Sequence, residues 1–113
     1  MAMEISHHPA APGTVVVTLA GRIMMGVESE RILTLVDELL AAGTTTIVFD
    51  LGGVTHIDST GIGRFIRSHH RIAAAGGEMR MAAATGHLFQ VFHVSQLDRM
   101  FPFYPGVDEA CKA

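Results

Sequence analysis

Apolar and polar residues follow patterns that predict short strands alternating with amphipathic helices. Thr14–Leu19 is rich in β-branched residues and Thr45–Leu51 contains a continuous apolar run, so both ranges are predicted to be strands. The continuous run is typical of a strand that is covered on both faces. Between these strands, apolar residues recur at helical spacing from Val27 to Ala42, and Gly43 is a suitable residue to end that helix.

The second half of the chain continues the alternation. A helix is predicted over Thr60–Ala75, and Gly76 and Gly77 are expected to end it. Its predicted buried stripe consists of Ile62, Phe65, Ile66, His69 and Ala73. The remaining predicted elements are a strand at Glu78–Ala83, a helix at Thr85–Val94, a short strand at Met100–Tyr104 interrupted by Pro102, and a terminal helix at Val107–Ala113.

The segments before and between these elements are expected to be an edge strand and turns. Met3–Ser6 is predicted to be a short edge strand, and His7–Gly13 a turn because it contains two prolines and a glycine. Gly21 and Gly26 bracket an expected loop, and a polar turn precedes a second apolar step at Val54–Ile57. Strands that alternate with helices predict one α/β domain over residues 1–113, with a mostly parallel sheet of four or five strands and about four helices.

Bulk properties narrow the classes of function. The chain has 113 residues, of which 49% are hydrophobic and 17% are charged, as expected of one folded domain. A net charge of −3 gives no general attraction to nucleic acid, and no apolar run approaches the roughly 18 residues of a membrane span. No signal peptide is visible, and the single cysteine, Cys111, has no partner for an internal disulfide. We therefore expect a cytoplasmic protein without direct membrane insertion.

The most informative segment is Asp58-Ser59-Thr60-Gly61, where an apolar step ends and a helix is predicted to begin. The first N–H groups of a helix lack partners within it and its dipole is positive there, so a phosphate is well tolerated. A plainer interpretation is that Asp58 or Ser59 caps the helix, and the local sequence alone favours this cap. No base accompanies Ser59 in the sequence, so its hydroxyl is expected to be acted on rather than to act.

The segment also resembles the signature loop of the STAS domain, the family of sulfate transporters and anti-sigma factor antagonists. The matching residues are Asp50-Leu-Gly-Gly-Val-Thr-His-Ile-Asp-Ser-Thr-Gly-Ile-Gly63. Three further segments resemble parts of the family in the same order along the chain: Leu19–Ile23, Ala74–Met81 and Val91–Phe101. The similarity extends roughly from Met3 to Ala110. The resemblance implies the STAS-like fold, a small mixed sheet with the helices packed mainly on one side.

The resemblance also implies a function. In anti-sigma factor antagonists the serine directly after the aspartate is phosphorylated by a partner kinase, and Ser59 is the matching position. The implied partners are a serine kinase anti-sigma factor of the histidine-kinase-like ATPase class, which binds the unphosphorylated protein, and a serine phosphatase. The protein is then a kinase substrate and not itself an enzyme. The alternative is a STAS subunit that is not phosphorylated and docks on the cytoplasmic ATPase of an ABC-type lipid transporter.

The residues around Ser59 form the expected partner-binding surface. They are Asp58, Thr60, Gly61, Ile62, Gly63, Arg64, Arg67, Met24 and Met25. Each has a plainer interpretation: the glycines can serve tight packing, the two methionines can be core residues, and the arginines, with Arg71, can form a solvated helix face. Some well-known antagonists carry an acidic residue near Met24, and its absence here leaves open which kinase fits.

Other kinds of site find little support in the sequence. The seven histidines do not match zinc spacing, and Asp50 and Asp58 lack an evident third ligand, so no metal is expected. The chain has neither a Gly-x-Ser-x-Gly nucleophile elbow nor a phosphate-binding Gly-x-x-x-x-Gly-Lys motif. No cofactor is expected, nucleotide binding without catalysis stays open, and nothing in the sequence requires more than a monomer.

Overall fold

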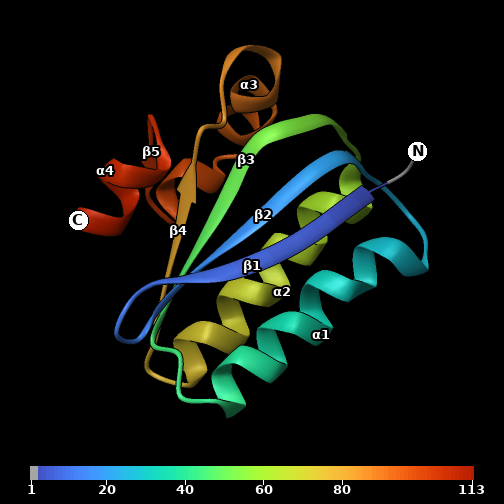
Figure 1. Cartoon of the computed structure of the whole chain (residues 1–113). Helices are drawn as coiled ribbons and strands as arrows, with labels where there is room; N and C mark the ends of the chain where they lie inside the picture. The colour runs from blue at the N-terminus through green and yellow to red at the C-terminus, as the bar shows by residue number, and fades with distance from the viewer. Residues whose placement is uncertain (1–2) are drawn as a thin grey trace.

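Strands and helices alternate along residues 3–113, the part of the chain that the computed structural model describes (Figure 1). The strands are β1 (Met3–Ala11), β2 (Thr14–Ile23), β3 (Thr46–Ile57), β4 (Glu78–Ala82) and β5 (Phe103–Tyr104). The helices are α1 (Val27–Ala41), α2 (Ser59–Ala74), α3 (Gly86–Val94) and α4 (Val107–Lys112), and a short 3-10 helix, η1, spans Leu97–Arg99. The predicted helices are all present, with ends shifted by no more than one residue; η1 was not predicted.

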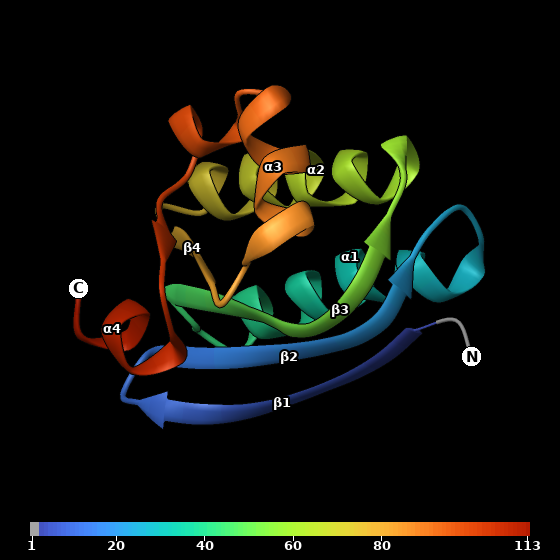
Figure 2. The ribbon, with the colours of Figure 1, turned by 90° about the horizontal axis from the view of Figure 1, so that it is seen from above.

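The strands form one mixed sheet in the order β1-β2-β3-β4-β5. β1 and β2 form an antiparallel hairpin, whereas each later strand pairs in parallel with the strand before it. Seen from above, α1, α2 and α3 lie on one side of the sheet and α4 lies apart from them (Figure 2). The predicted α/β fold, with a mostly parallel sheet covered mainly on one side, is confirmed.

The alternation of side chains along the strands explains the two layers. Val17 and Phe49 point toward the helices and belong to the main core, where the Phe49 ring meets Phe65 of α2 edge-on at 5.3 Å between centroids. Their neighbours Val16 and Val48 point the other way and pack against α4. Because β3 is covered on both faces, its apolar run is continuous, as the sequence predicted.

The hairpin differs from the prediction. The expected turn at His7–Gly13 is wrong, because β1 continues to Ala11 and only two residues connect it to β2. Pro9 lies inside the strand, which is possible because β1 is at the edge of the sheet and needs no partner on its outer side. The pairing with β2 becomes irregular between Pro9 and Ala11.

The strands that lead to the helix start are also longer than predicted. Val54–Ile57 is not a separate step after a turn but the end of β3, which pairs with β2 along this whole length. Likewise β2 continues to Ile23, so the expected loop from Gly21 shrinks to the segment before α1. The register between β2 and β3 shifts beside Gly53, where an added Cβ would lie 3.0 Å from the Ala20 side chain.

The buried face of α2 is rotated slightly from the predicted stripe. Of the predicted members, Phe65 is fully buried, whereas Ala73 is exposed. The residues that α2 buries are Gly61, Phe65, Ser68 and Ile72. Ser68 can be buried because its hydroxyl donates to the Arg64 carbonyl oxygen at 2.7 Å. The Arg64 side chain, on the same helix, reaches α1 and donates to the Ser29 hydroxyl.

Candidate functional site

The candidate site lies where β2 and β3 end side by side. Ile23 and Ile57 are register partners at these ends, so the segment that leads into α1 and the first turn of α2 are brought together. The Asp58 N–H donates to the Ile23 carbonyl oxygen at 3.3 Å, which continues the pairing of the two strands to the edge of the helix. Residues more than thirty positions apart in the sequence therefore form one surface.

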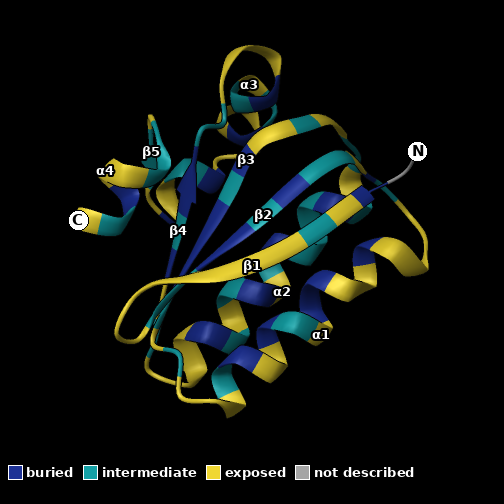
Figure 3. Cartoon of the chain, viewed as in Figure 1, coloured by how far each residue is buried: buried dark blue, intermediate teal, exposed yellow. Residues whose placement is uncertain are grey.

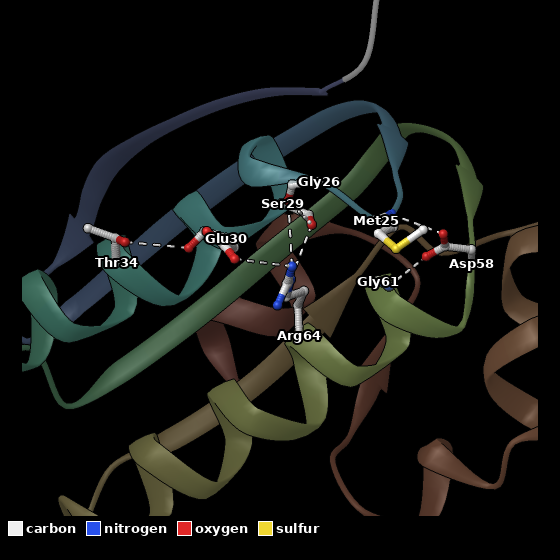
Figure 4. A network of polar contacts seen from close by, with 8 residues as sticks. All are labelled: Met25, Gly26, Ser29, Glu30, Thr34, Asp58, Gly61 and Arg64. Carbon is white, nitrogen blue, oxygen red and sulfur yellow. Dashed lines mark hydrogen bonds and ion pairs between the residues drawn. The ribbon is translucent and has the colours of Figure 1, made fainter.

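Asp58 is the N-cap of α2 and also holds the neighbouring loop (Figure 4). Its Oδ1 accepts the Gly61 N–H at 2.8 Å, which satisfies one of the free donors of the first turn. Its Oδ2 accepts the Met25 N–H at 3.0 Å. One carboxylate thus caps the helix and fixes the segment between β2 and α1, as the cap interpretation of this residue predicted in part.

The same contacts alter the acidity of the carboxyl group. The hydrogen bond from Gly61 N–H is the main cause that lowers the pKa of Asp58 below its ordinary value, and the Met25 N–H adds to it. Partial burial acts in the opposite direction but does not outweigh these donors. Asp58 therefore stays ionised beside Ser59 at neutral pH.

Ser59 is the first residue of α2 and is exposed. Because Asp58 provides the cap, the Ser59 hydroxyl is not needed for it, and it forms no hydrogen bond to another of residues 3–113. The imidazole of His56, three residues earlier in the chain, contacts the hydroxyl of Thr55 at 3.0 Å. Ser59 thus presents a free hydroxyl to solvent at a positive helix end, next to a fixed negative charge.

The two glycines of the first turn have different roles. Gly61 is buried, and a Cβ there would lie 2.3 Å from the Ile23 carbonyl oxygen, so no larger residue fits without movement of the backbone. Gly63 has open space around the position of a Cβ. Gly61 is therefore a packing residue, whereas packing gives no reason for glycine at position 63, and access for another molecule is the remaining interpretation.

Exposed apolar side chains flank the site on the side of α1. Met25 is 80% exposed and Val27, the first residue of α1, is 77% exposed, although both are apolar. The Met25 backbone is held at the start of α2 by Asp58. Met24, in contrast, is half-buried, as are Thr60 and Ile62, and Ile62 packs against the main core. Of the two predicted methionines, Met25 is thus the one that offers free apolar surface.

The predicted basic stripe divides into three different environments. The Arg64 side chain is only 12% exposed; its Nε donates to the Ser29 hydroxyl at 3.1 Å and its Nη2 to the Gly26 carbonyl oxygen at 3.5 Å. Arg71 forms an ion pair of 2.7 Å with Asp37. Arg67 is exposed and has no ion-pair partner among residues 3–113. The interpretation of Arg64 as part of a solvated face is therefore wrong, since it ties α2 to the start of α1 (Figure 4).

Sequence reasoning missed Ser29 and Val27. Ser29 is 1% exposed, and its hydroxyl donates to the Gly26 carbonyl oxygen at 3.1 Å while it accepts from Arg64. Ser29 lies three residues before Ile32, at a position that continues the apolar stripe of α1 toward its start, and this spacing was the available signal. Val27 could have been found as an apolar residue that the helical periodicity of α1 leaves outside its buried face.

Two other kinds of feature are not found in the described part of the chain. Residues 3–113 contain no group of three histidine, cysteine or acidic side chains that is placed to hold a metal ion. None of the helices described there is both long and apolar enough to cross a membrane.

Comparison with known proteins gives a family and a fold. The family model described as STAS domain matches residues 5–110. Among curated proteins, no relative matches the sequence. Solved structures do match: an anti-sigma factor antagonist from Mycobacterium paratuberculosis has a TM-score of 0.82 at 20% identity, with 98% of this chain and 92% of that chain covered.

Two further structures extend the comparison. The Bacillus cell fate determinant SpoIIAA in its phosphorylated form has a TM-score of 0.74 at 20% identity, with 96% of this chain and 97% of that chain covered. A sulfate transporter family protein from Wolinella succinogenes has a TM-score of 0.80 at 14% identity, with 91% and 85% covered. At these identities the likeness establishes the fold.

Proposed function

Because the chain belongs to the STAS domain family, we propose that it is an anti-sigma factor antagonist that is switched by phosphorylation of Ser59. Unphosphorylated, it binds a serine kinase anti-sigma factor of the histidine-kinase-like ATPase class. Phosphorylated on Ser59, it releases that partner, and a serine phosphatase restores the binding form. The observation that carries the proposal is the exposed Ser59 hydroxyl at the start of α2, beside a cap that does not need it.

The position of Ser59 allows modification without unfolding. A phosphate adds a charge of about −1.5 to −2 and three acceptor oxygens. At the start of α2 this charge meets the positive end of the helix dipole, which offsets repulsion from Asp58 within the free domain. The fold is therefore expected to stay the same on phosphorylation.

In a complex, the same phosphate is unfavourable. Met25, whose N–H is bound by the neighbouring Asp58, exposes an apolar side chain, and a partner that covers Met25 and Ser59 together removes water from the phosphate as well. Asp58, already ionised, adds like-charge repulsion in that drier environment. A loss of about 3 kcal/mol corresponds to a decrease in affinity of more than about a hundredfold.

The proposed contact surface follows from exposure. Met25, Ser59 and Arg67 are exposed and accessible for direct contact, and Arg67 provides positive charge for an acidic partner. Gly63 is half-buried but has open space at the position of a Cβ. Thr60 and Ile62, which are half-buried, lie on the same turn. Asp58, Gly61, Met24 and Arg64 act mainly by holding this surface in shape.

The first test is a pull-down from the lysate of the native host. The wild type is compared with Ser59→Ala and Ser59→Asp, and retained proteins are identified by mass spectrometry. The wild type and Ser59→Ala are expected to retain a serine kinase, whereas Ser59→Asp is expected to lose it. Thr85→Asp is the matched control, since it adds the same charge at the exposed start of α3, where Thr85 makes no side-chain cap.

The second candidate function is the alternative that the family resemblance implies, a STAS subunit that docks on the cytoplasmic ATPase of an ABC-type lipid transporter. The fold is compatible with a transporter-associated role, since a sulfate transporter family protein shares it. In that case Ser59 is an interface or cap residue and need not be modified. Retention of one transporter ATPase by the wild type, Ser59→Ala and Ser59→Asp alike would contradict the phosphorylation switch and support this subunit role.

A further inference from the structure

A groove of about 340 Å³ separates β1 from α1 at the edge of the sheet. Its floor is apolar and its rim is charged; the lining residues are Ile5, His7, Arg31, Thr34, Leu35 and Glu38. β1 pairs only with β2, so its outer backbone N–H and C=O groups have no strand partner among residues 3–113. The edge is also visible as the exposed strand at the front of the molecule (Figure 3).

The groove has charges of opposite sign at its two ends. α1 connects the parallel strands β2 and β3, so it runs opposite to them and in the same direction as β1, which is antiparallel to β2. Arg31 therefore lies toward the Ile5 end and Glu38 toward the His7 end. Neither charged side chain has an ion-pair partner within residues 3–113.

We propose that this edge binds a second copy of the chain, with the two β1 strands antiparallel about a twofold axis at Ser6. In that register Ile5 of each copy lies opposite His7 of the other, and the two grooves close over their apolar floors. The twofold axis also reverses α1, so the Arg31 end of one groove faces the Glu38 end of the other. The same twofold axis thus places Arg31 of each copy opposite Glu38 of the other, so that both unpaired side chains gain a partner of opposite charge.

The other face of the strand fits the same axis. Glu4 and His8 are exposed there, two residues to either side of Ser6, so each carboxylate lies opposite an imidazole of the second copy. Pro9, which has no N–H to donate, falls opposite Met3 at the end of the paired segment. The paired strands would extend the sheet across both copies and cover its exposed edge.

This dimer is independent of the proposed phosphorylation switch. The axis passes through the middle of β1, opposite Thr18 of β2, whereas Ser59 follows the far end of β3. Both Ser59 hydroxyls thus stay accessible. Nothing in the sequence alone indicated more than a monomer, because the charge symmetry depends on how α1 is placed against β1.

Sedimentation velocity over a range of protein concentrations tests the proposal with two charge reversals. Arg31→Glu creates two Glu–Glu contacts across the axis, and Glu38→Arg creates two Arg–Arg contacts, so each is expected to weaken dimerisation about tenfold or more. Both changes suit the dipole of α1, an acid near its start and a base near its end, so the fold is expected to persist. Arg99→Glu, an exposed reversal on η1, is the control and is expected to dimerise like the wild type.

The decisive sample is an equimolar mixture of the two reversed variants. A mixed dimer places the introduced glutamate of one variant opposite the introduced arginine of the other, so dimerisation is expected to return to the wild-type level. The double variant Arg31→Glu with Glu38→Arg is expected to dimerise as well. A wild type that stays monomeric at the highest concentration, or reversed variants that do not recover on mixing, would overturn the proposal.

Discussion

The carboxylate of Asp58 accepts the backbone N–H of Met25 at 3.0 Å while it caps α2 through Gly61 at 2.8 Å. The start of one helix and the loop before another are thereby held by a single side chain. Because Ser59 follows Asp58 directly, modification occurs beside the residue that keeps the proposed partner surface together. The geometry of this carboxylate leads to the first two predictions.

Replacing Asp58 with alanine is expected to destabilise the fold by about 2 kcal/mol, since loss of an N-cap and of a second hydrogen bond each contribute about 1 kcal/mol. Asp58→Asn is expected to lose less stability than Asp58→Ala, because its amide oxygen still accepts one of the two N–H groups. Urea unfolding measures both. Asp37→Asn, which removes an exposed carboxylate paired with Arg71, is the control and is expected to change stability little. An alanine variant as stable as this control would contradict the dual role.

The pH dependence of stability carries the signature of the same residue. The folded-state pKa of Asp58 is lowered, mainly by the Gly61 N–H, so its stabilising contribution is present above its ordinary pKa and is lost as pH falls through the lowered value. The difference in unfolding free energy between the wild type and Asp58→Asn is therefore expected to be constant above about pH 5 and to shrink below about pH 4. A difference that grows on acidification would contradict this sign. The lowered pKa of Asp98, caused first by its contact with His93, affects both proteins equally.

The two glycines of the first turn provide a matched pair. Gly61→Ala forces a Cβ to within 2.3 Å of the Ile23 carbonyl oxygen, so a loss of about 2 kcal/mol is expected from overpacking. Gly63→Ala has open space and is expected to be neutral or to stabilise by up to about 1 kcal/mol through helix propensity. Thermal unfolding compares them. Weaker kinase binding by a fully stable Gly63→Ala would place position 63 in the contact; equal destabilisation of both variants would refute the packing role of Gly61.

Arg64 and Arg67, three residues apart on α2, are expected to separate folding from binding. Arg64→Ala removes the contacts to Ser29 and Gly26 and is expected to cost about 1–2 kcal/mol of stability. Arg67→Ala is expected to change stability by less than about 0.5 kcal/mol but to weaken binding to an acidic partner. Chemical denaturation and a binding titration on both variants distinguish these effects. A loss of stability in Arg67→Ala, together with a loss of binding but not of stability in Arg64→Ala, would contradict the placement of the two side chains.

Local sequence patterns predicted the parts of the fold that depend on local physics. The helices, the buried run of β3 and the cap at Asp58 all follow from residue spacing and helix-end chemistry. The hairpin was missed because Pro9 indicates a turn unless the strand is known to lie at an edge. Arg64 and Met25 could not be placed, since their partners are set by the packing of α1 against α2 and by the parallel pairing of β2 with β3.

The most direct test of the central claim is the affinity of the captured kinase for two forms of this protein, unmodified and carrying phosphoserine at Ser59. Isothermal titration calorimetry measures both, and circular dichroism verifies that the fold is unchanged. The account predicts that the phosphorylated form binds about a hundredfold more weakly or worse, with the same fold. Equal affinity of the two forms would contradict the phosphorylation switch at the start of α2.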